Sequence, residues 1–410
     1  MKRAISKAST QVNDNLASSP PTSGDLVPAK RREAMWQMKT NYNHMKIMCF
    51  MNYKITGFVW VFLLTHQWVN AQMYEDTWHT ERTFKTTATF VVSVNNKYGS
   101  VVVSTWDKDS VRISVTRRVS EKSKERLKRM VESIDIRFRE GSGQVWAETV
   151  VGSKHTTFIQ DVKEAGNFAS ATPRTRIDYK IMVPSYVNIE VTNKYGDVVL
   201  PSFSGNAKID LSNGNLQARD FKGYAEMNLA FGSAEIRSIK QGKVFLNFMN
   251  FVCDASDKLT LEGRSSEIRI KEARQLKIDS RRDRLSLGQV KELEATTYFS
   301  SLNCLNLKEF VRLHLTYGRL EQLTMARDFK GCEIVSQTCD VNLRLMTPVA
   351  YSALIQSGKT LNLPVGLKPE SIDYKSLIHS EPMRFNYLKR MPADKIKVNI
   401  SDGELKIEHQ

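Results

Sequence analysis

Aromatic side chains recur at near-constant spacing in the middle of the chain and could stack on sugar rings. The ladder comprises Tyr195, Phe231, Phe299 and Tyr317, with Met249 at an equivalent position. Positions of the same register between them carry Asn213, Ser265 and Arg282. The alternative is that these side chains seal the corner of a coiled chain. No tryptophan occurs between residues 176 and 345, which counts against a carbohydrate platform.

Acidic side chains that could cleave a polysaccharide lie in the same part of the chain. Asp197, Glu235 and Glu267 follow the turns, but Asn215 and Ser233 interrupt them. Glycoside hydrolysis needs two carboxylates close together, and lyase chemistry usually needs acidic calcium ligands beside a base. The basic cluster 281–284 has no acidic column beside it. We therefore expect no catalytic residues and a protein that is not an enzyme. A β-helix polysaccharide lyase or hydrolase is the enzyme alternative.

The histidines do not have the spacing of metal ligands. None of the seven lies within four residues of another, so neither H-x-H nor H-E-x-x-H occurs. Phosphate-binding glycine loops and the nucleophile elbow of serine hydrolases do not follow any expected strand. The sequence therefore predicts neither a metal nor a cofactor.

A fixed period of about 18 residues indicates stacked copies of one small unit. The period is set by aliphatic residues at Val198, Leu216, Ala234, Val252, Ile268, Leu285, Leu302 and Leu320. Two residues before each lies a turn former, at Gly196, Gly214, Gly232, Asn250, Ser266, Asp283, Ser300 and Gly318. The unit is too short for a helical hairpin, so strands and turns must fill it.

A second apolar column accompanies the first, so each repeat holds two strands. It runs through Ile209, Met227, Phe245, Leu261, Ile278, Ala295 and Leu313. We expect a mainly β protein, with a single-stranded β-solenoid (a β-helix or β-roll) over residues 176–345. The expected structural turns are Gly99, Gly196, Gly214, Gly232 and Gly318, because glycine adopts a positive φ without steric cost.

Two further regions flank the repeats. Residues 73–175 are expected to form an N-terminal β region with one helix at 120–134, for which Ser120 is the N-cap. The segment 94–103 matches 191–200 around Lys-Tyr-Gly, which predicts the same strand–turn–strand unit in both. Residues 346–410 are expected to form an irregular C-terminal cap with closing strands, including a hairpin-like pair within 395–408.

The N-terminal residues have the composition of a targeting segment. Residues 45–71 combine flanking lysines, an uncharged apolar run and small side chains before a cleavage point after Ala71, as in a secretory signal peptide. Residues 1–44 are polar, are expected to be disordered, and precede the expected true start at Met45, Met48 or Met51. Cleavage would leave no transmembrane span in the mature chain. Sequencing the mature N-terminus tests this; a start beyond Ala71 supports export, and an intact Met1 contradicts it.

Charge and cysteines bear on partners. The net charge of +16 favours anionic glycans or lipid surfaces over neutral ones, and its alternative is a solvated basic surface. Nucleic acid is not expected as a partner, because the basic residues are spread along the chain.

Cys304 is expected inside the coil, beside Leu302. Cys332 and Cys339 are close enough in sequence to form a disulfide across one turn.

The order of these features resembles a family of bacterial envelope proteins known as "putative adhesin", especially its Bacteroidetes members. The resemblance lies in the signal peptide, Asn-Lys-Tyr-Gly-x-Val-Val, the strand 179–184 and successive Gly-x-aliphatic turns, and covers roughly residues 84–345 and 403–407. It implies a β-solenoid outside the cytoplasm with no established enzymatic activity. The chain departs from the pattern in its long leader, its non-glycine turns and the segment after Thr347.

The expected function is that of a non-catalytic exported scaffold or adhesin-like binding protein of the cell envelope. Its location would be the periplasm, the outer membrane surface or the medium, and its partner a glycan or an envelope protein. The alternatives are the carbohydrate-active enzyme considered above and an envelope-sensing partner of a membrane regulator.

Overall fold

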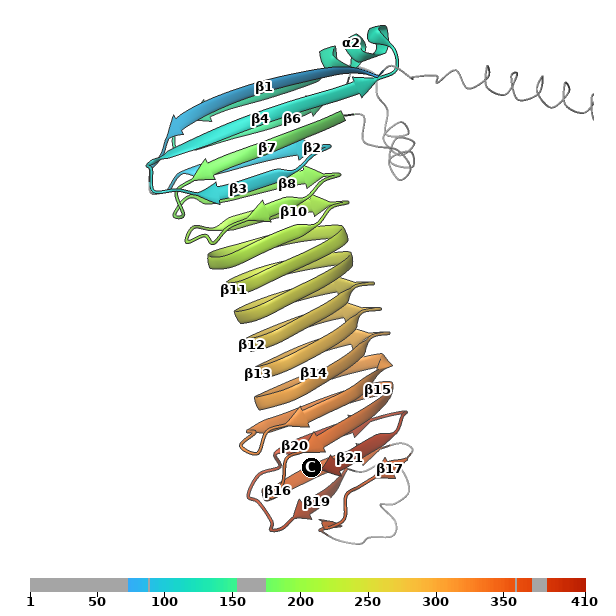
Figure 1. Ribbon diagram of the computed structural model, residues 1–410. Helices are drawn as coiled ribbons and strands as arrows, with labels where there is room; N and C mark the ends of the chain where they lie inside the picture. The colour runs from blue at the N-terminus through green and yellow to red at the C-terminus, as the bar shows by residue number, and fades with distance from the viewer. Residues whose placement is uncertain (1–72, 88, 153–174, 358–359, 371–381) are drawn as a thin grey trace, which may run out of the picture. The chain divides into compact units, whose positions relative to one another are not determined.

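The computed structural model describes residues 73–87, 89–152, 175–357, 360–370 and 382–410 (Figure 1). The expected leader (1–44) and signal peptide (45–71) lie outside these residues. Among the residues that are described, no helix is long and apolar enough to cross a membrane.

The described chain is mainly β, and its strands join in one large mixed sheet. Its helix is α2 (Lys124–Glu132). The strands are β1 (Tyr74–Lys85), β2 (Val91–Lys97), β3 (Val101–Thr105), β4 (Ser110–Glu121), β5 (Ile134–Gly141), β6 (Gln144–Val151), β7 (Thr175–Val183), β8 (Asn188–Lys194), β9 (Val198–Leu200), β10 (Ala207–Ser212), β11 (Leu216–Arg264), β12 (Glu267–Arg281), β13 (Arg284–Tyr298), β14 (Ser301–Met325), β15 (Gly331–Leu345), β16 (Tyr351–Ser357), β17 (Leu361–Asn362), β18 (Leu367–Pro369), β19 (Met383–Tyr387), β20 (Ile396–Ile400) and β21 (Leu405–His409).

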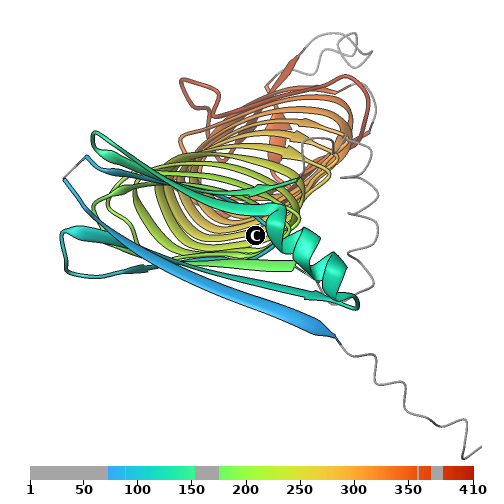
Figure 2. The same cartoon turned by 90° about the horizontal axis from the view of Figure 1, so that it is seen from above.

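From β8 to β15 the chain winds through parallel strands in register (Figures 1 and 2). Ile209 lies opposite Met227 of the next repeat, and Ile268 lies opposite Leu285 in the same way. We call one such repeat a rung. Side chains alternate between the two faces of a strand, so every second residue points into the coil. Leu285 and Leu302 are therefore buried in one column.

The two expected apolar columns each contain one wrong residue. Phe251, not Val252, is fully buried and lies opposite Ile268. In the second column Val244 is fully buried, and Phe245 is only half-buried. The rungs become one residue shorter after Gly232, which shifts the register by one. A shift of one residue moves every side chain of a strand to the opposite face, and both sites offer two adjacent apolar residues.

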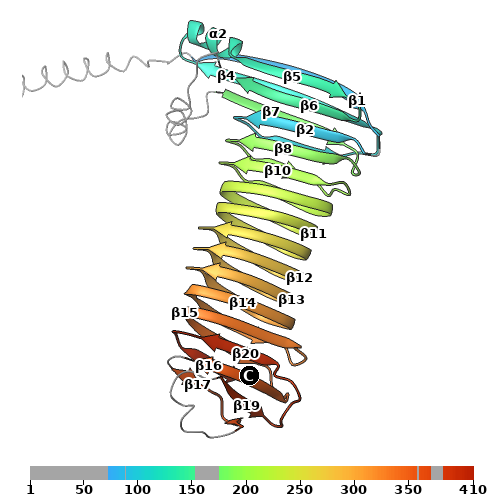
Figure 3. The same cartoon turned by 180° about the vertical axis from the view of Figure 1, so that it is seen from behind.

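The match between segments 94–103 and 191–200 is confirmed. Val94 lies opposite Val191, and Val101 lies opposite Val198, so the two copies form adjacent rungs. The chain between them supplies strands beyond the first rung, where β6 and β7 pair in parallel with β2 and β3. The outermost strands are antiparallel: β5 pairs with β6, and β4 pairs with both β7 and β1 (Figure 3).

The helix of this region is shorter than the sequence predicts. Ser120 is not its N-cap, because it lies within β4, which continues to Glu121. The cap is Ser123, whose hydroxyl accepts a hydrogen bond from the N–H of Arg126. The apolar residues of the helix are half-buried against the core at Leu127, Met130 and Val131.

The C-terminal strands do not form the expected hairpin. β20 and β21 both pair in parallel with β15, where Ile396 lies opposite Cys332 and Leu405 opposite Val341. They are successive strands of one rung, because Gly403 turns the coil rather than reversing the chain. β16 and β17 then pair with β20 and β21, and β19 and β18 continue the sheet in antiparallel order. The stack is thus closed by a segment that precedes its last rung in sequence.

Candidate ligand-binding corner

Each rung turns sharply at one edge, where one residue has a positive φ. These residues form the corner column: Tyr98, Tyr195, Asn213, Phe231, Phe248, Ser265, Arg282, Phe299, Tyr317 and Thr338. The residue after each forms the floor column: Gly99, Gly196, Gly214, Gly232, Met249, Ser266, Asp283, Ser300, Gly318 and Cys339. The turn column expected from the sequence is this floor column, except that Met249 replaces Asn250.

The floor glycines are needed for close packing, not for a positive φ. A Cβ on Gly196 would overlap the carbonyl oxygen of Gly99, and one on Gly214 would overlap that of Gly196. A Cβ on Gly232 or on Gly318 would likewise overlap a carbonyl oxygen of the rung before it. The positive φ belongs to the preceding residue, so the reason given for the glycines at the sequence level is wrong. Glycine permits backbones to approach where any side chain would collide.

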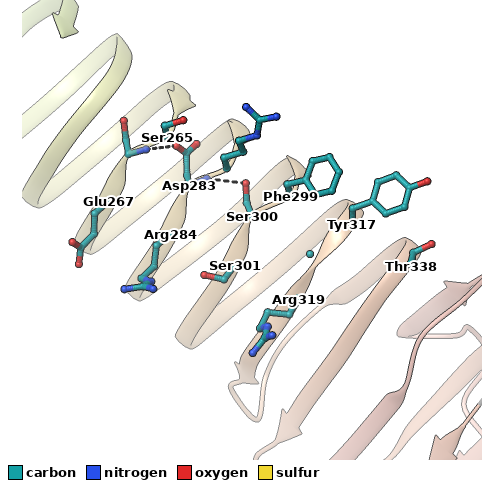
Figure 4. Close-up of a pocket in the computed structure, with 13 residues that line it drawn as sticks. Ser265, Glu267, Asp283, Arg284, Phe299, Ser300, Ser301, Tyr317, Arg319 and Thr338 are labelled. Atoms are coloured by element: carbon teal, nitrogen blue, oxygen red, sulfur yellow. Dashed lines mark hydrogen bonds between the residues drawn. The ribbon is translucent and has the colours of Figure 1, made fainter. Parts of the chain in front are cut away.

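The middle rungs replace glycine with polar side chains that cap the backbone. The hydroxyl of Ser266 accepts a hydrogen bond from the N–H of Met249 at 3.0 Å. Asp283 Oδ1 accepts one from the N–H of Ser266 at 2.7 Å, and Ser300 Oγ accepts one from the N–H of Asp283 at 3.1 Å (Figure 4). Each of these floor side chains thus accepts a hydrogen bond from a backbone N–H of the rung before it.

Asp283 is the most heavily bonded of these side chains. Its Oδ2 accepts hydrogen bonds from the Ser280 hydroxyl at 2.7 Å and from the N–H of Arg281 at 3.1 Å. Burial raises the pKa of the Asp283 carboxyl, although these bonds and the one from Ser266 act in the opposite direction. The carboxylate is occupied by structural bonds and forms the floor of the corner.

Aromatic residues of the corner column stack on each other in pairs. Ring centroids are 5.5 Å apart for Tyr98 and Tyr195, 5.3 Å for Phe231 and Phe248, and 5.1 Å for Phe299 and Tyr317. Tyr98 is buried, whereas 50% of Phe231, 55% of Phe248, 50% of Phe299 and 43% of Tyr317 is exposed. The corner therefore presents two exposed aromatic pairs, separated by Ser265 and Arg282.

The expected ladder is brought together in part. Phe299 and Tyr317 are neighbours, Phe231 lies further along the same column, and Tyr195 stacks on the missed residue Tyr98. Met249 was a wrong choice, because it is buried in the floor. The aromatic residue of its rung is Phe248, which lies midway in sequence between Phe231 and Ser265. Equal steps along the column would have found it.

The two exposed pairs have different surroundings. Beside Phe231 and Phe248 lie the uncharged residues Ser233, Asn247 and Asn250. Around Phe299 and Tyr317 the neighbouring positions carry exposed arginines, at Arg281, Arg282, Arg284 and Arg319, and a fifth, Arg264, lies opposite Arg281 on the rung that follows Phe248. None of these five guanidinium groups forms an ion pair with a described residue. Glu267, which lies opposite Arg284 in register, is paired with Arg269 at 2.6 Å.

A groove of about 620 Å³ runs along the second pair over five rungs (Figure 4). One wall is the corner column from Ser265 to Thr338, and the other consists of Glu267, Arg284, Ser301 and Arg319. The floor is Ser266, Asp283, Ser300 and Gly318. Aromatic rings and guanidinium groups thus line one depression of the size that small-ligand sites have.

The carboxylates considered for catalysis do not form a cluster: one accepts hydrogen bonds from the neighbouring rung, and another is offset along its own rung. Asp197 Oδ1 accepts hydrogen bonds from the N–H and side-chain amide of Asn215 at 2.9 and 3.0 Å. Glu235 lies two residues further along its rung than the other two. Within the described ranges no group of three His, Cys, Asp or Glu residues could hold a metal ion.

The described cysteines are free thiols, so the structure does not contain the expected bridge between Cys332 and Cys339. Cys332 points into the coil from β15, whereas Cys339 lies in the floor column, where its sulfur accepts a hydrogen bond from the N–H of Gly318 at 3.0 Å. Cys304 is buried, as its position beside Leu302 predicts, and burial raises its pKa to about 12.

Comparison with known proteins gives structural neighbours only. No protein-family model matches the chain, and no curated protein matches it. The chain is similar to a structure from Parabacteroides distasonis described as a "putative adhesin", at 10% identity and a TM-score of 0.32, with 67% of this chain and 96% of that one covered. A "putative cell adhesion protein" from Clostridium sporogenes shares 9% identity over 82% of this chain and 100% of that one, with a TM-score of 0.19.

A third neighbour, also from Parabacteroides distasonis, is described as a "putative lipid binding protein". It shares 10% identity over 81% of this chain and 96% of that one, with a TM-score of 0.22. The descriptions of the first two neighbours agree with the family that the sequence resembles. At these identities and TM-scores they carry no argument about what the chain binds.

Proposed function

We propose that the chain is a non-catalytic, adhesin-like binding protein, built as a β-solenoid of short two-strand rungs, whose corner column binds carbohydrate. Export to the cell envelope or medium is part of the proposal and rests on the sequence of residues 45–71. The carrying observation is the pair of exposed aromatic stacks at a turn that does not require aromatic residues.

The turn itself is better served by small residues. A positive φ costs a non-glycine residue roughly 1–2 kcal/mol, and it is unusual for a bulky side chain. Asn213 occupies the same turn one rung before Phe231, so the coil turns without an aromatic residue. Stacking of two rings returns only about 0.5–1.5 kcal/mol. Stability therefore does not explain four half-exposed rings in this column.

Binding does explain them. The backbone of every rung is bonded to the rungs on either side, so the rings are held at fixed spacing before any ligand arrives. Preorganised groups lose little conformational entropy on binding. Phe248 borders the small residue Ser265, and Tyr317 borders Thr338, so one side of each stack lies next to a smaller side chain. A sugar ring placed there would extend the stack.

A glycan array probed with the full chain tests this proposal. We expect retention on at least one class of saccharide and its loss in the variant F231A/F248A/F299A/Y317A. The matched control is Tyr224→Ala, because Tyr224 is 46% exposed and lies outside the corner column. Absence of retention, or equal retention by the quadruple variant, would overturn the proposal.

The non-catalytic part of the proposal has its own test. Incubation of the full chain with acidic and neutral polysaccharides is expected to release no reducing ends and no unsaturated products. The supporting observation is that Asp197 already accepts hydrogen bonds from Asn215, and that Glu267 is paired with Arg269. Depolymerisation that disappears in Glu267→Gln would favour the β-helix enzyme instead.

A further inference from the structure

We infer that the groove beside Phe299 and Tyr317 binds an acidic saccharide, carboxylated or sulfated, through Arg282, Arg284 and Arg319. The inference rests on the proposed carbohydrate-binding function and names the ligand class for one of its two aromatic pairs. The neutral pair, Phe231 and Phe248, is expected to lack this selectivity.

Uncompensated positive charge is the first observation. Arg264 and Arg281 lie directly opposite each other in register, and Arg282 follows at the corner. Like charges placed opposite each other in a sheet are destabilising. Elsewhere neighbouring rungs place opposite charges together, as Lys277 and Glu294 do at 2.8 Å. At the corner Glu267 lies opposite Arg284 in register but is paired with Arg269. None of the corner arginines therefore forms an ion pair with a described acidic side chain, and a bound anion would supply the counter-charge.

The positions of the arginines along the groove are the second observation. Arg282 belongs to the corner column, as the two rings do. Arg284 and Arg319 belong to the opposite wall (Figure 4). Adjacent rungs are about 4.8 Å apart, so the four steps from Ser265 to Thr338 make the groove about 19 Å long. It runs along the stack, which suits an extended chain of repeating units with an acidic group on successive residues.

The combination of groups selects for a saccharide over a simple anion. Guanidinium groups bind carboxylates and sulfates through two parallel hydrogen bonds. A small inorganic anion would use these groups and leave Phe299 and Tyr317 exposed to water. An acidic sugar presents both an anionic group and an apolar ring face, so it can contact both walls of the groove at once.

Titration calorimetry of the full chain with three hexasaccharides tests the inference. The probes are oligogalacturonate (carboxylated), a heparin fragment (sulfated) and cellohexaose (neutral). At least one acidic probe is expected to bind at least tenfold more tightly than cellohexaose, with an affinity that falls as salt is added. The variant R282Q/R284Q/R319Q is expected to lose about tenfold for each charge-assisted contact removed, while its binding of cellohexaose stays unchanged.

The matched control is K222Q/K240Q/K258Q, which removes the same net charge from exposed lysines midway between successive corners. It is expected to bind the acidic probes as the unmodified chain does. Equal loss in the control and in the arginine variant would reduce the effect to net charge and overturn the inference. So would cellohexaose binding as tightly as both acidic probes, although the proposed function would then stand.

Two further outcomes separate the inference from the proposed function. If the chain retains no saccharide on the glycan array, both the proposed function and this inference are wrong. The second outcome uses a single-stranded DNA twelve-mer. If it displaces both acidic probes and binds more tightly than either, the arginines form a nucleic-acid site, and the inference of an acidic saccharide is wrong.

Discussion

The two exposed aromatic pairs lie on the same corner of the same coil but differ in the side chains around them. In the floor column Gly232 follows Phe231 and Met249 follows Phe248, whereas Ser300 follows Phe299 and Gly318 follows Tyr317. The first pair borders amides and hydroxyls, and the second borders exposed arginines. The backbone turn is the same in both. The side chains below the turn set how the rungs are held together, and those beside it set what can bind.

The floor difference is a choice between two ways of closing the turn. Where the floor is glycine, the backbone of one rung packs directly on the carbonyl of the one before. Where it is Ser or Asp, a side-chain oxygen accepts a backbone N–H from the preceding rung. A glycine floor leaves no space for a side chain. A polar floor requires a side chain that can accept a hydrogen bond.

The largest effect is expected from adding a methyl group to the glycine floor. Gly214→Ala would place a Cβ against the carbonyl of Gly196 and force the rungs apart. Overpacking of this kind costs about 3 kcal/mol, and we expect urea unfolding to show at least that loss. The matched change Ser300→Ala removes one cap and should cost about 1 kcal/mol. Equal losses in the two variants would contradict the distinction between the floors.

Removal of the Asp283 side chain should have the next largest effect. Asp283→Ala leaves the N–H of Ser266, the N–H of Arg281 and the hydroxyl of Ser280 without their acceptor. Unpaired buried donors cost about 1–3 kcal/mol, so a loss of about 2 kcal/mol is expected from thermal or urea unfolding. Asp283→Asn keeps one acceptor oxygen and should cost less. An alanine variant as stable as the unmodified chain would contradict the account of the polar floor.

The pH dependence of stability should have opposite signs for two carboxyls. The folded-state pKa of Asp283 is raised by burial, so its contribution is present below its ordinary pKa and is lost as pH rises through the folded value. The pKa of Asp220 is lowered, chiefly by the hydrogen bond from Arg237, with burial opposing. Its contribution is present above the ordinary pKa and is lost as pH falls through the folded value.

Unfolding of Asp283→Asn and Asp220→Asn between pH 3 and 7 measures this contrast. Relative to the unmodified chain, the deficit of Asp283→Asn is expected to shrink as pH rises, and that of Asp220→Asn to grow. A common slope for both variants would show that the Asp283 carboxyl is not held by burial as described.

The smallest effect on stability is expected from the exposed rings. F231A/F248A and F299A/Y317A each remove one stacked pair that is about half exposed, so each should cost at most about 1 kcal/mol. Unfolding of the two variants beside Tyr224→Ala measures this. A loss above about 3 kcal/mol in either would indicate that the rings seal the coil, and the corner would then be a structural feature.

Much of the coil could be predicted from the sequence because its rules are local. Alternation of inward and outward residues, the glycine floor and the repeated Lys-Tyr-Gly segment all identify rungs without long-range information. The prediction failed where two apolar residues are adjacent, at 244–245 and 251–252, because either register buries one of them. The same one-residue shift hid Phe248 and put Met249 in its place.

The chemistry of the corner was less accessible from sequence. Residues 281–284 were recognised as a basic cluster. The sequence did not show that the coil brings Arg264 and Arg319 to the same edge as this cluster. The carboxylates could not be assigned either. Asp283 belongs to the floor because of three donors that come from two different rungs.

The central claim, that the corner column is a ligand surface with two selectivities, is tested most directly by calorimetry on two variants. The full chain, F231A/F248A and F299A/Y317A are each titrated with oligogalacturonate, the heparin fragment and cellohexaose. The account predicts that F299A/Y317A loses the acidic saccharide and that F231A/F248A retains it while losing part of the neutral binding. Two variants that bind all three probes as the unmodified chain does would contradict it.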